Sequence, residues 1–186
     1  MTIRIIGGEL KGRKLLTVAG KQTRPTSDRV RESIFDILGD TVRDACVLDL
    51  YAGTGAMGIE ALSRGAKWVL FAENHKAALA ALAKNIKKCS LENRIRIVRC
   101  NILDNLNILQ LHGAAFDLVF IDPPYNQEMI QPTLSHLAQS QCLANGARLA
   151  IEHSPREPIP EDQPEFEVAD RRRYGKTLVS FLIYMV

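Results

Sequence analysis

The chain has 186 residues, of which 46% are hydrophobic and 24% charged, and its net charge is +3. This length suits one compact globular domain with room for a small appendage. The N-terminal stretch has neither the apolar core of a signal peptide nor a spanning segment, so we expect a cytoplasmic protein without a membrane partner. Four cysteines without close pairs and four histidines without ligand spacing argue against a disulfide framework and a metal site.

The charge is unevenly distributed along the chain. Residues 1–31 carry a net charge of +6 and the remainder −3. A second basic cluster follows at 171–176, where three arginines and a lysine lie close together. Such asymmetry is typical of an end that faces a polyanion, but for charge clusters alone a solvated surface is the favoured explanation. Charge alone therefore does not establish nucleic-acid binding.

The first elements precede the main alternating pattern. In residues 2–16 apolar and polar side chains alternate, and glycines mark a turn between them, which predicts a β-hairpin with a basic face. A helix is expected to begin near Ser27, a suitable N-cap, with an apolar stripe that includes Val30, Ile34 and Leu38. We predict an N-terminal basic hairpin extension over 1–23 and a main domain over 24–186.

From residue 45 onward, short apolar runs alternate with helical patterns. Strands are expected at 45–51, 68–73, 94–99, 116–122 and 147–152, and helices at 56–65, 75–89, 102–111 and 128–140. Alternation at this spacing predicts a doubly wound α/β fold with a parallel sheet, because parallel neighbours need crossover connections. After a proline-rich stretch, runs at 166–174 and 177–185 predict a terminal antiparallel hairpin joined through Gly175.

The first strand of this pattern ends in a glycine loop that leads directly into a helix. Gly53 and Gly55 allow the backbone to approach a ligand closely, and Gly58 completes a G-x-G-x-x-G spacing. A nucleotide-containing ligand fits this loop, and a structural tight turn is the alternative. Glu73 ends the second strand, where a carboxylate can accept hydrogen bonds from ribose hydroxyls. Asp49 would repel a pyrophosphate but tolerate a cationic sulfonium and amino group, although it could also cap the helix.

The fourth strand ends in Asp122-Pro123-Pro124-Tyr125, the most informative stretch of the chain. The lone pair of a base amine is delocalised into the ring, so methylation requires acceptors that make the nitrogen more tetrahedral. The Asp122 carboxylate and the Pro123 carbonyl can accept its two hydrogens, and the prolines hold the turn rigid. Tyr125 offers a flat face for a base that has left its stack. A simple turn that closes a buried strand is the alternative.

Across most of its length the chain resembles the bacterial small-subunit ribosomal RNA guanine-N2 methyltransferases, the RsmD-type enzymes. The segments that carry the likeness are 4–15, 24–38, 47–66, 116–125 and 174–177. The motif RPTSDRVRE at 24–32 is more specific than the glycine loop or DPPY, which many amino-methyltransferases share. Two positions depart from the family pattern: Tyr51 stands where phenylalanine is more common, and Asn101 where an aspartate often receives the adenine amino group.

The resemblance implies a Rossmann-like fold that uses S-adenosylmethionine (SAM), with a mostly parallel seven-stranded sheet, an antiparallel C-terminal hairpin and the small N-terminal extension. It implies that the substrate is 16S ribosomal RNA and that the target is the 966-type guanine. It also implies that the enzyme is a monomer and acts on this RNA within a ribosomal particle. Asp28 should also lie near the mouth of the site. The expected catalytic residues are Asp122, Pro123, Pro124 and Tyr125. The expected cofactor-binding residues are Asp49, Tyr51, Gly53, Gly55, Glu73, Asn74, Asn101 and Ile102. The expected RNA-binding residues are Arg4, Lys11, Arg13, Lys14, Arg24, Thr26 and Arg29.

Three other functions remain open at the level of sequence. DPPY also suits methylation of adenine N6 in DNA, although no target-recognition domain is apparent. The glycine loop, taken literally, suits a dinucleotide-dependent oxidoreductase, which would leave DPPY unexplained. A non-enzymatic RNA-binding module with a vestigial pocket is the third alternative.

Overall fold

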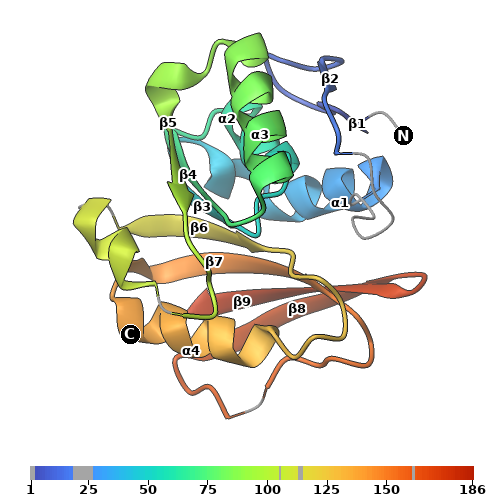
Figure 1. Cartoon of the computed structure of the whole chain (residues 1–186). Coiled ribbons are helices and arrows are strands. Elements are labelled where there is room, and N and C mark those ends of the chain that lie inside the picture. The colour runs from blue at the N-terminus through green and yellow to red at the C-terminus, as the bar shows by residue number, and fades with distance from the viewer. Residues whose placement is uncertain (1–2, 19–26, 105, 113–114, 161) are drawn as a thin grey trace.

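The structure, a computed structural model, describes residues 3–18, 27–104, 106–112, 115–160 and 162–186. A seven-stranded sheet forms its centre, in the order β5-β4-β3-β6-β7-β9-β8 (Figure 1). Its strands are β3 (Cys46–Leu50), β4 (Trp68–Glu73), β5 (Ile95–Arg99), β6 (Phe116–Ile121), β7 (Leu143–His153), β8 (Phe166–Tyr174) and β9 (Thr177–Tyr184). The first five strands in this order, β5, β4, β3, β6 and β7, pair in parallel. Strand β9 then pairs antiparallel with β7, and β8 pairs antiparallel with β9. The predicted α/β fold and terminal hairpin are confirmed.

Helices cover both faces of this sheet. One face carries α1 (Asp28–Leu38), α2 (Ala56–Ser63) and α3 (Lys76–Cys89), and the other carries α4 (Ile130–Ser140) and the 3₁₀ helix η3 (Asn107–His112). The central strand β3 is buried on both faces, because Val47 packs under α1 to α3 while Leu48 packs on the side of α4. Two apolar layers therefore flank the sheet, as parallel sheets require. Shorter 3₁₀ turns, η1 (Gly39–Val42) and η2 (Glu92–Arg94), connect these elements.

Helix α1 begins where its sequence predicts. Ser27 is the N-cap, and its hydroxyl accepts a hydrogen bond from the Val30 N–H at 3.3 Å. Val30, Ile34 and Leu38 are buried against the sheet, as their spacing requires. Gly39 ends the helix at φ 51°, a conformation that costs glycine little.

The helix expected at 102–111 is instead the six-residue 3₁₀ turn η3. The preceding residues form a side-chain-capped turn: the Asn101 side chain accepts from the Leu103 N–H at 3.3 Å and donates to Asp104 at 2.8 Å. Such local side-chain bonds compete with helical backbone bonds, so too few residues remain for an α-helix. Leu109 still packs into the core beside α4, which explains the apolar periodicity.

The predicted N-terminal hairpin is present as β1 (Ile3–Arg4) paired with β2 (Lys14–Leu15). It is fastened to helix α2 by Glu60, a fully buried carboxylate that accepts the N–H groups of Ile6 and Gly7, both at 2.7 Å. The predicted boundary at residue 23 falls within 19–26, outside the described residues, and stays a prediction. No helix within the described ranges is long and apolar enough to cross a bilayer.

Candidate functional site

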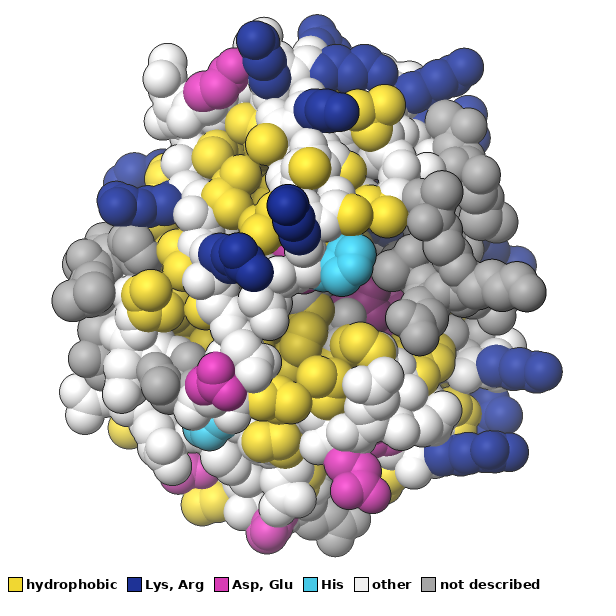
Figure 2. Space-filling view, viewed as in Figure 1, with side chains coloured by type: hydrophobic (Ala, Val, Ile, Leu, Met, Phe, Trp, Pro, Cys, Tyr) yellow, Lys and Arg dark blue, Asp and Glu magenta, His cyan; other side chains and the backbone are white. Residues whose placement is uncertain are grey.

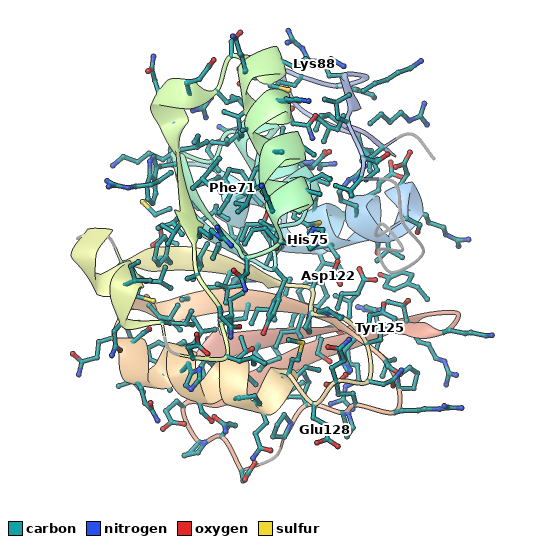
Figure 3. All side chains as sticks on the ribbon, viewed as in Figure 1. Phe71, His75, Lys88, Asp122, Tyr125 and Glu128 are labelled. Atoms are coloured by element: carbon teal, nitrogen blue, oxygen red, sulfur yellow. The ribbon has the colours of Figure 1, made fainter. Side chains whose placement is uncertain are left out.

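The carboxyl ends of β3 and β6 lie side by side at the centre of the sheet. They pair in parallel from Val47 opposite Leu118 to Leu50 opposite Ile121, so the glycine loop and DPPY leave the same edge. Strand β4 flanks β3 on its other side, which makes the gap between β3 and β6 the point where the strand order reverses. Ligands bind at this switch point in open α/β sheets. Asp122, Tyr125 and His75 all lie at this edge (Figure 3).

A hollow of about 380 Å³ opens here, within the size range of small-molecule sites. In the space-filling view, hydrophobic side chains lie along this hollow, next to a histidine (Figure 2). Its lining joins residues from four loops of the sheet edge: Tyr51, Glu73, Asn74, His75, Lys76, Arg99, Cys100, Asn101, Ile102, Pro124 and Met129. Five predicted cofactor residues and one predicted catalytic residue therefore share this hollow, while His75, Lys76, Arg99, Cys100 and Met129 were not predicted to do so.

Glu73 links the second strand to the glycine loop. Its carboxylate accepts the Gly53 N–H at 2.7 Å on one oxygen, and the N–H groups of Asn74 and His75 at 2.8 and 2.7 Å on the other. A carboxylate has about four acceptor positions, so the oxygen that faces Gly53 can accept one more hydrogen bond. Glu73 can thus hold its loop and still receive a ribose hydroxyl.

Asp49 lies beneath the glycine loop, and it does not line the hollow. It is 3% exposed, and its carboxylate accepts the Gly58 N–H in the first turn of α2 at 2.9 Å. This bond is the helix-capping alternative noted from the sequence, and a direct role toward the cofactor stays a prediction. Burial raises the pKa of Asp49 to about 8, against the lowering effect of the Gly58 hydrogen bond. At neutral pH the side chain is therefore mostly protonated.

The two loop glycines, Gly53 and Gly55, are required for different reasons. Gly53 has φ 56°, and a Cβ there would meet only the Tyr51 carbonyl at 3.9 Å, so its surroundings are open. Gly55 has φ 82°, and a Cβ there would lie 2.3 Å from the Leu82 side chain on α3. Close approach of the ligand suits Gly53, whereas Gly55 is required by packing against α3. Tyr51, also at positive φ, is tied through its hydroxyl to Thr133 on α4 at 2.6 Å.

The other predicted cofactor residues in the lining of the hollow follow the ends of β4 and β5. Asn101 is exposed and sits in the turn after β5, with its side-chain oxygen engaged by Leu103. Ile102 is 4% exposed and adds an apolar surface. Asn74 follows Glu73 directly and is exposed. An amide and an apolar wall beside each other suit a flat heterocycle with polar edges.

The DPPY segment is held from several sides. Pro123 is buried, while Asp122 is half-buried and Pro124 exposed at the hollow. The Tyr125 hydroxyl donates to Glu152 at 2.7 Å and lies 3.0 Å from the Thr177 hydroxyl. Burial and the Glu152 carboxylate raise the pKa of Tyr125, so the phenol remains a donor. The ring orientation is therefore fixed by β7 and β9.

The loop after DPPY has its own support. Glu157, 9% exposed, accepts the N–H groups of Asn126 and Met129 at 2.9 and 3.0 Å. Sequence reasoning missed Glu157, Glu152 and Thr177. Glu152 ends a predicted strand at the same edge, which was an available signal, but Glu157 lies in a proline-rich stretch that gave none.

The predicted RNA-binding residues are spread over the N-terminal elements, and their role stays a prediction. Lys11, Lys14 and Arg29 are exposed. Arg4 pairs with Asp28 at 3.2 Å at the start of α1, and Arg13 donates to the Lys88 carbonyl at 2.7 Å, at the far end of α3 from His75 (Figure 3). Arg24 and Thr26 lie outside the described residues.

The site residues fit SAM better than a dinucleotide. The Asp49 side chain takes a first-turn N–H of α2, the kind of donor that a pyrophosphate would use. Glu73 suits a ribose, and Tyr51, Ile102 and Met129 give apolar walls. With the seven-stranded sheet and its antiparallel end, these features define a SAM-dependent methyltransferase of Rossmann-like fold.

Within that class, the chain belongs to the family described as conserved hypothetical protein 95, whose model matches residues 3–183. The "Putative rRNA methyltransferase YlbH" of Bacillus subtilis is 33% identical over 178 residues, covering 96% of this chain and 97% of the relative. The ribosomal RNA small subunit methyltransferase D of Escherichia coli K12 is 38% identical over 150 residues, covering 81% and 74%. The solved "Putative methyltransferase yhhF" of Escherichia coli superposes with a TM-score of 0.87 at 32% identity, covering 100% and 99%. The resemblance to RsmD-type enzymes is confirmed.

Proposed function

We propose that this protein transfers a methyl group from SAM to the exocyclic N2 amine of a guanine in small-subunit ribosomal RNA. The observation that carries the proposal is the adjacency of two loops: DPPY leaves β6 directly beside the glycine loop that leaves β3. Ribosomal RNA as the substrate class is supported by relatives named as ribosomal RNA methyltransferases at 33% and 38% identity.

The amine would be oriented by acceptors of the DPPY segment. The Asp122 carboxylate accepts one N–H and the Pro123 carbonyl the other, which turns the nitrogen lone pair toward the methyl donor. Buried Pro123 and the Glu157 contacts to the following loop keep these acceptors from moving. Pre-positioned acceptors cost no reorganisation when charge develops on the nitrogen.

The target guanine must leave its stack to reach this point. Tyr125 offers a ring face for it, and the tether of its hydroxyl to Glu152 fixes that face in one orientation. Aromatic stacking is worth about 1–3 kcal/mol per base, which offsets part of the cost of unstacking. Tyr125 thus stabilises the extruded base beside Asp122.

The cofactor would be held by Glu73 at its ribose, by Asn101 and Ile102 at its adenine, and by the backbone around Gly53. SAM supplies an electrophilic methyl group on a sulfonium. The guanine nitrogen forms its new bond to that carbon as the carbon–sulfur bond breaks, and the surplus N–H proton then leaves to Asp122 or to water. Asp122 therefore orients the amine first and can receive its proton afterwards.

The test uses purified protein, methyl-labelled SAM and small ribosomal subunits from cells that lack the enzyme. Naked small-subunit RNA and duplex DNA serve as alternative substrates. We expect label in RNA as N2-methylguanine, with at least a hundredfold lower kcat for Asp122→Asn, because the amide loses the charged acceptor. Label in adenine of DNA alone would move the substrate to DNA, and SAM binding without any transfer would favour a non-enzymatic RNA-binding role.

Two further features belong to this proposal. The enzyme acts as a monomer on an RNA–protein particle, and the basic residues Arg4, Lys11, Arg13, Lys14, Arg24, Thr26 and Arg29 assist RNA binding. Comparing initial rates on assembled subunits and on naked RNA tests the first point, and sedimentation of the protein with its substrate tests its stoichiometry. Equal rates on both substrates would remove the particle from the proposal.

A further inference from the structure

The turn between β8 and β9 lies next to the DPPY segment. Thr177 opens β9, and its hydroxyl lies 3.0 Å from that of Tyr125. Lys176 and Gly175 precede Thr177 in the turn, and Arg173 and Tyr174 close β8. Residues 171–176 comprise the end of β8 and the two residues that connect it to β9, and we call them the basic turn. The basic turn is therefore at the rim of the proposed base-binding site, although it is about 50 residues from DPPY in sequence.

The basic turn is anchored on three sides. The Tyr174 hydroxyl is hydrogen-bonded to the Ser33 hydroxyl on α1. The Arg171 Nε donates to the Ser180 hydroxyl at 3.3 Å, and Thr177 meets Tyr125. These contacts join the turn to α1, to β9 and to the DPPY loop, so its cations have a defined position relative to the site.

The cations of the basic turn are available to a ligand. Arg171, Arg172, Arg173 and Lys176 are all exposed. Arg172 pairs with Asp170 at 2.8 Å, but within the described part of the chain Arg171, Arg173 and Lys176 make no ion pair with a carboxylate. Figure 2 shows basic side chains projecting at the end of the molecule where Figure 1 draws this turn. Cations left unneutralised beside a nucleic-acid site favour phosphate contacts.

The N-terminal hairpin is placed differently. Arg13 is bonded to the Lys88 carbonyl near the end of α3, whereas His75 at the start of α3 borders the hollow. Lys88 is twelve positions beyond Lys76, which is about 18 Å along a helix. Arg13 and Lys14, which both contact Lys88, therefore lie at the end of α3 away from the hollow, whereas the basic turn lies beside DPPY.

We propose that the basic turn binds the phosphates that flank the target nucleotide and so positions the base against Tyr125. This inference rests on the proposed action on RNA and adds a contact surface that the N-terminal residues do not provide. Arg173 and Lys176 are its principal cations because neither has a carboxylate partner among the described residues, whereas the Arg171 side chain is bonded to Ser180 on β9. Phosphate contacts position a nucleic acid without reading its sequence, so the basic turn contributes affinity and register.

The test measures methylation of small subunits by the double variant R173E/K176E over a range of salt concentrations. We expect at least a tenfold rise in KM for the RNA substrate, with kcat and the Kd for SAM within about twofold of the parent. The slope of log affinity against log salt should become shallower by about 1.4 to 1.8, for two lost phosphate contacts. R173Q/K176Q, which adds no repulsion, should show the same direction with a smaller rise.

The matched control is R43E/K67E, which makes the same change in net charge at exposed residues before β3 and β4, on the opposite edge of the sheet. Its KM should remain within about twofold of the parent.

The arginines of β8 have an alternative role, because β8 is an edge strand and charged side chains there can prevent edge pairing. Sedimentation of each variant tests this role. An unchanged KM and salt slope for R173E/K176E, with or without self-association, would overturn the inference. A parent enzyme that methylates no RNA would instead overturn the proposed function.

Discussion

Replacing Asp49 by asparagine should change how stability depends on pH. Asp49 is buried under the glycine loop, and its pKa is raised from the ordinary value of 3.8 to about 8. Between these two values the native chain retains a proton that the unfolded chain releases. The free energy of unfolding therefore falls as pH rises, by about 1.4 kcal/mol per pH unit from this group. The stabilising contribution is complete below pH 4 and is lost progressively up to about pH 8.

Asparagine cannot ionise, but its side-chain oxygen can still accept the Gly58 N–H. The stability of Asp49→Asn relative to the parent should therefore increase by about 3 kcal/mol between pH 5 and pH 7. Urea unfolding of both proteins at pH 5, 6 and 7, without SAM, measures this difference. Asp49→Ala should show the same slope but lie about 1–3 kcal/mol lower throughout, because the buried Gly58 N–H loses its acceptor. A difference that stays constant with pH would show that the carboxyl group ionises normally and would refute the reasoning.

Three further substitutions test packing and positioning. Gly58→Ala should destabilise the fold by about 1–3 kcal/mol, seen as a lower urea midpoint, because its Cβ would lie 2.3 Å from the Phe71 ring. Glu60→Ala should cost about 3–5 kcal/mol in the same assay, since it removes the fully buried carboxylate near Arg31 and leaves that buried charge to the partly exposed carboxylate of Asp28. Tyr125→Phe should keep the stacking face but lose the tether to β7, so kcat should fall about tenfold while the Kd for SAM stays constant; an unchanged kcat would contradict the positioning role.

The elements that could be predicted from sequence are those set by local patterns. Alternating apolar runs gave the sheet and its helices, and Ser27 marked the start of α1 because a hydroxyl before an apolar stripe is a capping signal. The error at 102–111 has the same origin, since apolar periodicity does not register the competing side-chain bonds of Asn101. Helical spacing predicted burial there correctly and the type of helix wrongly.

Contacts between distant segments could not be predicted in this way. The N-terminal charge excess counts Arg31 as a surface cation, yet Arg31 is fully buried, with Asp28 at 3.0 Å and Glu60 at 3.8 Å from its guanidinium. Burial lowers its pKa, and the nearby carboxylates of Glu60 and Asp28 oppose that shift. Charge counting does not separate a buried structural cation from one that meets RNA. The roles predicted for the site residues stay predictions until the substitutions above are measured.

The glycine loop is held in place by protein groups alone. Glu73, from the end of β4, accepts the N–H of Gly53, and Asp49, from β3, accepts that of Gly58. Both ends of the loop are therefore fixed by acidic side chains before any ligand arrives, which lowers the entropy cost of binding. The same logic applies across the sheet edge, where Glu152 fixes Tyr125 and Glu157 fixes the loop that follows. Each of these acidic side chains already holds a backbone or side-chain group in place, so a substitution at any of them changes the geometry of the loops at this edge.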